Sequence, residues 1–454
     1  MNIQENAEPM AGNRFVQTLT TALLALVFLT FPAIVSARAA VEIQEVTSPG
    51  GVSAWLVEDY TVPIVSVRFA FEGGSTQDPD GKEGLSNLMT GLFDEGAGDL
   101  DSDTFQERLD EVGAEMSFEA NRDAVYGQMR MLEEQRGEAL GLLQLALTSP
   151  RFDQEPIDRI RGQIVTGIQQ DLRDPNTLGQ DEFARALYGD HPYARRSDGT
   201  LESLASITAE DLRTLHGRTF ARDNIHIAVV GAIDAETLKG ELDRVFGDLP
   251  QQAELAPVPE VEPRLDQQVD YDYPLPQATI QLVYPGIDRD DPEFFAAFIM
   301  NHILGGGTFS SRLFNEVREK RGLAYGVGSG LLNNDYSNAL YIGTSTRADN
   351  VDEALTVIRD EVRKMAEEGP TPEELASAKT YLIGAYPINN LDSSLAVART
   401  LVQLQLDELG IDYIDRRVGY IEAVTIEQVK EAAQRLLQAE PAILVIGPEA
   451  SDGG

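Results

Sequence analysis

The chain has 454 residues, a length that suggests two or more domains. With 42 % hydrophobic and 24 % charged residues it has the composition of a globular protein and not of a disordered chain. Its formal net charge of −39 disfavours a nucleic-acid partner, because such a surface repels phosphate backbones. The absence of cysteine excludes disulfides, Cys-ligated metals and thiol catalysis.

The N-terminus has the pattern of a secretory signal peptide. Arg14 precedes a short apolar run at residues 21–35, and Ala-Arg-Ala at 37–39 offers a cleavage site before Ala40. The run is shorter than the roughly 20 apolar residues of a membrane span, although a retained anchor stays open. We therefore expect a signal peptide over residues 1–39 and an exported protein, periplasmic in a cell with two membranes.

The remainder of the chain repeats itself. The strand-like segment 63–69 matches 276–282 at an offset of 213 residues. Thr208 and Thr425, 217 residues apart, each open a helix with the Thr-x-x-acid/amide pattern of a capping box. Apolar strands ending at Gly231 and Gly447 follow these helices. We infer a duplicated domain of roughly 210 residues.

The domain boundaries follow from this repeat. We expect an N-terminal domain at 40–250 and a C-terminal domain at 274–450. The segment 251–273 is rich in proline and acidic residues and has no apolar period, so it is expected to be an extended linker.

Each unit combines strands with helices. Residues 65, 67 and 69 are apolar and alternate with Ser66 and Arg68, the pattern of a half-buried strand. Helices are expected at 82–93, 103–112, 133–147, 157–171 and 209–219 in the first unit, and at 293–303, 313–321, 351–368, 371–386, 393–408 and 426–438 in the second. We predict an α+β fold in which each half is a largely antiparallel sheet with helices on one face, the two halves forming a clamshell.

The second unit contains a glycine-rich block. It reads Gly305-Gly306-Gly307-Thr-Phe-Ser-Ser-Arg-Leu and leads into a segment running from Glu316 to Tyr325. With the duplication and the stretches 72–85 and 189–193, this block resembles the pitrilysin (insulinase) family of zinc metallopeptidases. That family includes mitochondrial processing peptidases and bacterial two-subunit peptidases.

The family's zinc signature, His-x-x-Glu-His, is degenerate in this chain. Two histidines four residues apart on a helix bind one Zn²⁺, and the glutamate between them acts as general base. The matching positions here are Asn87, Thr90 and Gly91. The third ligand, a glutamate, would come from the helical stretch 159–170, which has no carboxylate. Neutral Asn, Thr and Gly do not replace these ligands, so we expect no zinc in this chain.

Other metal sites are weakly indicated. His216 and His226 lie ten residues apart, on an expected helix and the following strand, whereas His191 and His302 are expected to cap or pack. An acidic loop holds Asp94, Glu95, Asp99, Asp101 and Asp103 and is expected to be solvated, with loose Ca²⁺ binding as the alternative.

Arg318 and Tyr325 match a pair that binds substrate and stabilises the oxyanion in the family. Gly322 is expected to end the helix that carries Arg318, so that Tyr325 enters the next strand. The resemblance also implies that Gly305, Gly306 and Gly307 approach the peptide backbone closely. The alternative is that Arg318 forms a surface ion pair and that Tyr325 only packs.

Together these features predict a non-catalytic, substrate-binding subunit of an exported, heterodimeric zinc peptidase. The chain would hold no cofactor itself. A homologous partner chain would bring the zinc, and unfolded peptides would be substrates. The alternatives are a peptide-binding or scaffold pseudo-enzyme and a stand-alone peptidase with an unrecognised metal site.

Overall fold

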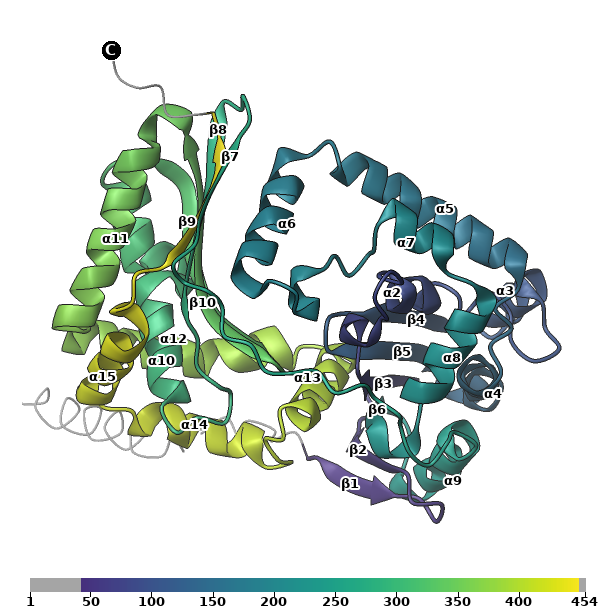
Figure 1. Ribbon diagram of the computed structural model, residues 1–454. Helices are drawn as coiled ribbons and strands as arrows, with labels where there is room; N and C mark the ends of the chain where they lie inside the picture. Colours follow the sequence, from purple (N-terminus) through teal and green to yellow (C-terminus); the bar gives the residue numbers. More distant parts are fainter. Residues whose placement is uncertain (1–41, 449–454) are drawn as a thin grey trace, which may run out of the picture. The chain divides into compact units, whose positions relative to one another are not determined.

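The computed structural model describes residues 42–448, which form two sheets covered by helices (Figure 1). The first sheet has the strand order β1-β2-β6-β3-β5-β4 and the second β7-β11-β8-β10-β9. The first contains β1 (Gln44–Thr47), β2 (Ser53–Glu58), β3 (Ile64–Glu72), β4 (Glu115–Ala120), β5 (Ala124–Leu132) and β6 (Ile225–Gly231). The second contains β7 (Gln268–Asp272), β8 (Gln277–Pro285), β9 (Ala324–Asn334), β10 (Ser337–Arg347) and β11 (Ala442–Gly447). The expected signal peptide lies outside the described residues.

The two sheets share one topology. In the first, β2 pairs parallel with β6, and β3 pairs antiparallel with both β5 and β6. In the second, β7 pairs parallel with β11, and β8 pairs antiparallel with both β10 and β11. The outer strands β4 and β9 pair antiparallel with β5 and β10. The predicted α+β class with a duplicated, largely antiparallel sheet is therefore confirmed.

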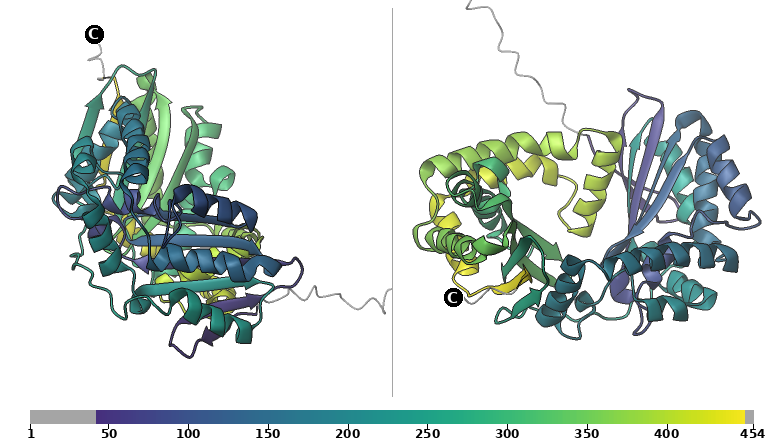
Figure 2. Two further views of the ribbon diagram at one scale, coloured as in Figure 1. Left: turned by 90° about the vertical axis from the view of Figure 1, so that its right-hand side faces the viewer. Right: turned by 90° about the horizontal axis from the view of Figure 1, so that it is seen from above.

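Helices cover one face of each sheet, and Figure 2 shows these layers from two further directions. The first half contains α2 (Leu85–Thr90), α3 (Ser102–Glu111), α4 (Arg136–Thr148), α5 (Gln154–Asp171), α6 (Pro175–Tyr188), α7 (Leu201–Ser206), α8 (Ala209–Thr219) and α9 (Ala235–Phe246). The second half contains α10 (Phe294–Asn301), α11 (Val351–Glu368), α12 (Pro372–Asn390), α13 (Ser394–Leu406), α14 (Tyr413–Ala423) and α15 (Ile426–Leu437). Val67 and Phe69 of β3 join helical residues in the first core, and Ile280 and Leu282 of β8 do so in the second.

The opposite face of each sheet is covered by a helix from the other half. Helix α13 contacts β3 and β6, and Gln405 Nε2 donates a hydrogen bond to the Ile227 carbonyl at 3.0 Å. Helix α6 contacts β7 and β11, and its Phe183 and Leu187 pack in one cluster with Ile446. Because α6 and α13 occupy equivalent positions in the repeat, the duplicated halves exchange a helix.

The segment expected as a linker has two parts. Residues 251–267 form no helix or strand but are held by hydrogen bonds, among them Ala256 N to Gln77 Oε1 at 2.7 Å and Val261 N to Tyr336 O at 2.8 Å. Residues 268–272 form β7 and extend the second sheet through parallel pairing with β11. This strand is positioned by backbone hydrogen bonds to β11, which the side-chain pattern of the sequence does not reveal.

Two expected helices differ from their predictions. The helix expected at 82–93 spans only Leu85–Thr90, because Gly84 has φ +88°, outside the right-handed helical region. The helix expected at 313–321 contains a π-helical segment, η7 (Phe314–Glu319). No helix in the described part of the chain is long and apolar enough to cross a membrane.

Candidate functional site

The degenerate motif lies on α2, a short helix anchored by one buried carboxylate. Asp78 is 4 % exposed and accepts hydrogen bonds from Gly84 N and Ser86 N, both at 2.9 Å, and from Ser86 Oγ at 2.6 Å. These bonds favour the charged carboxylate, but burial outweighs them and raises the pKa of Asp78 to about 7. The helix is thus held in place without any metal ligand on it.

The positions of the motif do not fit zinc. Thr90 Oγ1 donates to the Asn87 carbonyl at 2.8 Å, so its hydroxyl is used within the helix. A Cβ built on Gly91 would lie 2.9 Å from Ile160 Cγ2 of α5. The neighbouring helix has therefore closed over the place where a histidine side chain would leave α2. Among the described residues no group of three or more His, Asp and Glu side chains could hold a metal ion.

Helix α5 does carry carboxylates, which corrects the expectation for this helix as a whole. It extends beyond 159–170, so it includes Glu155, Asp158 and Asp171. Asp158 pairs with Arg161 at 2.8 Å, and Asp171 pairs with Arg196 at 2.8 Å. Asp158 and Asp171 are therefore used in ion pairs, and none of the three carboxylates belongs to a group of possible metal ligands among the described residues.

The four histidines have separate structural environments. His191 Nε2 lies 2.8 Å from the Pro259 carbonyl, and His226 Nε2 lies 2.8 Å from Glu72 Oε1. His216 contacts the Leu147 carbonyl at 2.9 Å, and burial lowers its pKa to about 4. His302 stacks on Tyr381, with ring centroids 5.0 Å apart.

The acidic loop after α2 is a set of caps and ion pairs. Asp101 accepts from Thr104 N at 3.0 Å and caps α3. Glu95 pairs with Arg159 and accepts from Ser102 Oγ, while Asp94 accepts from Gln106 Nε2 at 3.1 Å. These contacts account for three of the five carboxylates of the loop.

In the glycine block, neighbouring atoms leave little room for a Cβ atom. Gly305 lies in a π-helical turn, η5 (His302–Gly306), and is buried; a Cβ on it would lie 2.5 Å from Ser329 Oγ of β9. Gly306 is exposed. A Cβ on Gly307 would lie 2.7 Å from the His302 carbonyl oxygen, too close without movement. Whether these glycines also contact a peptide stays a prediction.

Arg318 lies on the surface of η7. Its guanidinium lies 4.7 Å from the centroid of the Phe314 ring, and its Nε is 3.7 Å from Glu319 Oε1. The ring of Phe309, a residue 73 % exposed, lies nearly perpendicular to that of Phe314, with ring centroids 5.0 Å apart. Sequence reasoning missed Phe309, although an aromatic residue beside a glycine triplet is a signal for a peptide-binding surface.

Tyr325 stands at the start of β9, beyond Gly322, whose φ of +63° ends the preceding helical segment as expected. Its side chain is 86 % exposed and lines a cavity of about 510 Å³. Gln180 of α6, Gln281 of β8 and Tyr341 of β10 also line this cavity. No contact between Arg318 and Tyr325 is found among the described residues, and the Arg318 side chain is only 37 % exposed.

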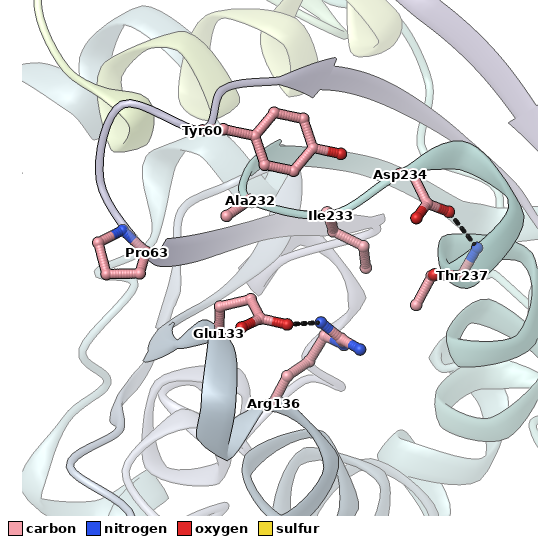
Figure 3. Close-up of a pocket in the computed structure, with 8 residues that line it drawn as sticks. All are labelled: Tyr60, Pro63, Glu133, Arg136, Ala232, Ile233, Asp234 and Thr237. Atoms are coloured by element: carbon pink, nitrogen blue, oxygen red, sulfur yellow. Dashed lines mark hydrogen bonds and ion pairs between the residues drawn. The ribbon is translucent and has the colours of Figure 1, made fainter.

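A second cavity, of about 360 Å³, lies beside the turn after β6 (Figure 3). Arg136 pairs there with Glu133 at 3.0 Å and with Glu241 at 3.4 Å. Asp234 accepts from Thr237 N at 2.7 Å and caps α9. Its charged groups are thus engaged with protein, and the cavity carries no sign of a ligand.

Comparison with known proteins defines the class. Residues 54–200 match the model described as insulinase (peptidase family M16), and residues 206–382 match the model described as peptidase M16 inactive domain. The crystal structure of a peptidase M16 inactive domain from Pseudomonas fluorescens is 30 % identical, with a TM-score of 0.84, and the match covers 91 % of this chain and 99 % of that one. The chain belongs to the insulinase family, peptidase family M16, and lacks the family's zinc-binding residues.

Two curated relatives extend the comparison. An uncharacterized zinc protease of Streptomyces coelicolor is 27 % identical over 421 residues, which cover 89 % of this chain and 90 % of that protein. The non-peptidase homolog YmxG of Helicobacter pylori is 23 % identical over 379 residues, covering 82 % of this chain and 86 % of that protein. The predicted family resemblance is confirmed.

Proposed function

We propose that this chain is the non-catalytic, substrate-binding subunit of an exported, two-subunit zinc peptidase. A homologous chain with an intact His-x-x-Glu-His motif would bring the metal and the general base. This chain would contribute Arg318 and Tyr325, a cation and a phenol donor aimed at the charge that develops on the scissile carbonyl. The substrates would be unfolded peptides.

The exposed phenol of Tyr325 carries this proposal. A tyrosine that only packs is expected to bury its ring, whereas Tyr325 is 86 % exposed at the rim of a cavity of about 510 Å³. The closed Gly91–Ile160 contact supports a partner as the source of the metal. The printed name of the Helicobacter relative, a non-peptidase homolog, agrees with a role without independent chemistry.

A peptide-binding or scaffold role without any peptidase is the second candidate. Phe309, exposed and three residues after the exposed Gly306, favours it, because an exposed aromatic ring and an accessible backbone are groups that a peptide could contact. It predicts no dependence of any reaction on Arg318 or Tyr325. A stand-alone peptidase would require stoichiometric zinc in the purified chain.

Reconstitution tests the proposal. The mature chain is mixed with a copurifying homologous chain that carries the intact motif, and steady-state peptide hydrolysis is measured. Tyr325→Phe or Arg318→Gln should lower kcat by about 10²–10³ if the contact forms in the transition state. Circular dichroism and copurification should stay unchanged.

Control variants change an exposed tyrosine and an arginine outside the proposed pair. Tyr60→Phe, at another exposed tyrosine, and Arg321→Gln, in the same segment as Arg318 and paired with Glu316, should leave the rate unchanged. If Arg318 is only an ion-pair partner, its loss should alter stability by about 1 kcal/mol or less and leave the rate intact. Wild-type kinetics in both test variants would favour the scaffold role.

Export has its own test. The polypeptide recovered from the periplasmic fraction should begin at Ala40 by N-terminal sequencing. A polypeptide that keeps residues 1–39 and sediments with membranes would instead identify the apolar run as an anchor.

A further inference from the structure

A third cavity, of about 290 Å³, lies in the second half, away from Tyr325. It is enclosed by α10, α12 and α14, which contact one another. Five aromatic residues and Tyr381 at its rim line it, together with two arginines, Arg289 and Arg417. This combination of aromatic walls and two guanidinium groups is not part of the site described above.

Arg417 is buried without an anionic partner. It projects from α14, is 6 % exposed, and donates from one guanidinium nitrogen to the Leu382 carbonyl at 3.1 Å. Its guanidinium lies 4.1 Å from the ring centroid of Tyr386 and 5.8 Å from that of Phe298. No carboxylate of the described residues forms an ion pair with it. Buried charges are ordinarily paired, so an unpaired guanidinium beside a cavity points to a missing anion.

Arg289 adds a second positive charge to the same cavity. Its guanidinium lies 4.1 Å from the centroid of Phe294, and it donates to Tyr413 Oη at 2.6 Å. Asp407 is its carboxylate partner, at 3.8 Å from Nε. Of the two guanidinium groups, only that of Arg289 therefore has a carboxylate partner among the described residues, at a long distance.

The pKa of the Arg417 guanidinium also reflects its buried position beside Arg289. Burial lowers the pKa of the Arg417 guanidinium; Tyr413, to which it is hydrogen-bonded, and Tyr386 oppose this shift, whereas the positive charge of Arg289 adds to it. The excess charge is notable in a chain whose net charge is −39, where carboxylates are abundant.

We propose that this cavity binds a carboxylate carried on an apolar or aromatic body. The carboxylate would lie between the Arg289 and Arg417 guanidinium groups, which offer the planar, multiple donors that suit it. The body would lie against the rings of Phe295 and Tyr386. The volume is near the lower end of the range for small-molecule sites, so the occupant is about the size of one aromatic amino acid. This inference does not rest on the proposed peptidase role.

Two sources share this chemistry: a free aromatic acid and the C-terminal residue of a peptide. The probes are N-acetylphenylalanine, a tetrapeptide that ends in phenylalanine with a free carboxylate, and the C-terminal amide of each. Binding to the mature chain is measured by isothermal titration calorimetry. N-acetylphenylalanine should bind with a dissociation constant of about 1 mM or below, on the typical ligand efficiency of small molecules. Its amide should bind at least about tenfold more weakly, because the charge-assisted hydrogen bonds are lost.

The tetrapeptide distinguishes the sources. Binding of both acids identifies a peptide C-terminus as a fitting occupant, and binding of the free acid alone restricts the site to small aromatic acids. Two results would overturn the proposal. One is equal binding of acid and amide, and the other is no detectable binding of N-acetylphenylalanine at a ligand concentration of about ten times the expected dissociation constant.

Variants locate the site. Arg289→Gln, at a partly exposed side chain, and Arg417→Gln should each reduce the preference for acid over amide by about tenfold. Arg416→Gln is the matched control, because Arg416 is adjacent on α14, pairs with Asp412 at 2.8 Å and does not line the cavity. If Arg417→Gln fails to fold, Arg289→Gln alone decides: an unchanged acid preference in that variant contradicts the proposal.

Discussion

Gly91 lies where the family places a metal-binding histidine, and the neighbouring helix has taken up the space. The Cβ position of Gly91 is 2.9 Å from Ile160 Cγ2, closer than side-chain contacts allow without movement. The packing of α2 against α5 therefore leaves too little room for a side chain at residue 91 unless Ile160 moves. Reversing the ligand residues alone does not reverse that packing.

Restoring the motif should accordingly fail. Gly91→His should destabilise the chain by about 1–3 kcal/mol, as overpacked substitutions do, whereas Asn87→His at a half-buried position should have a smaller effect. Urea unfolding measures both. The triple variant Asn87→His, Thr90→Glu, Gly91→His should bind less than one equivalent of zinc in metal analysis. Combination with Ile160→Ala should recover part of the lost stability; an additive result would show that Ile160 is not the obstacle.

Asp78 gives α2 a pH dependence. The folded-state pKa of about 7 lies above the unfolded value of 3.8, so the stabilising contribution of Asp78 is full below about pH 4 and is lost as the pH rises through 7. The stability of the wild-type chain relative to Asp78→Asn should therefore fall between pH 5 and pH 8, measured by urea unfolding at each pH.

A control with the opposite shift accompanies this prediction. The hydrogen bond from Thr104 lowers the pKa of Asp101, so its contribution is complete above about pH 4. The stability difference between wild type and Asp101→Asn should stay constant from pH 5 to pH 8. A similar constancy for Asp78→Asn would mean that Asp78 is ionised throughout this range.

The sequence was enough to predict that the zinc ligands are missing, but it did not predict which side chains are buried by packing between helices. Asn87, Thr90 and Gly91 are adjacent in sequence, so helical periodicity was enough to compare them with a metal-binding pattern. Arg416 and Arg417 are neighbours of the same type, yet one is exposed and the other is 6 % exposed. Only the packing of α10 and α12 against α14 distinguishes them, and this packing has no local signal.

At the scale of elements, capping chemistry was the most reliable predictor. The capping boxes predicted at Thr208 and Thr425 are present, and α8 and α11 have the predicted bounds. Helices α6, α7, α9 and α14 were not predicted. Helix α6 has a mixed polar and apolar sequence, because its apolar side is used against a sheet 80 or more residues away in the chain.

The packing of α6 leaves a specific requirement for glycine. A Cβ on Gly179 would lie 2.6 Å from Ile446 Cγ1, and Ile446 is fully buried. Gly179→Ala should therefore destabilise the chain by about 1–3 kcal/mol despite the better helix propensity of alanine. Thermal or urea unfolding measures the effect.

Gly167 supplies the comparison. It lies inside α5, is exposed, and has no atom within 4 Å of its Cβ position. Gly167→Ala should stabilise the chain by about 0.5–1 kcal/mol through propensity alone. If both alanine variants shift stability in the same direction, α6 does not pack on the second sheet as described.

At the scale of the whole described chain, helix exchange links the two halves. Val397, Leu401 and other apolar residues of α13 are buried, and α6 contributes Phe183 and Leu187 to the second half. Each such side chain contributes about 1.5–3 kcal/mol on burial. The linker is therefore not the only connection between the halves.

A chain cut in the linker should consequently stay together. A specific protease site inserted between Gln251 and Gln252, both exposed, should allow complete cleavage. The nicked protein should elute from a sizing column at the volume of the intact chain and separate only in denaturant. Two peaks of about 210 residues each under native conditions would show that the exchanged helices hold too weakly.

Helix exchange also sets an order on folding during synthesis. The ribosome completes β6 at Gly231 long before it reaches the end of α13 at Leu406. At about 5–20 residues per second, the interval is roughly 10–35 s. During this interval the face of the first sheet that α13 will cover is exposed. The first half therefore cannot complete its packing until α13 has been synthesised. For the export proposed above, in which the chain would cross a membrane unfolded, such a delay would keep the first half incompletely packed until nearly all of the chain has emerged.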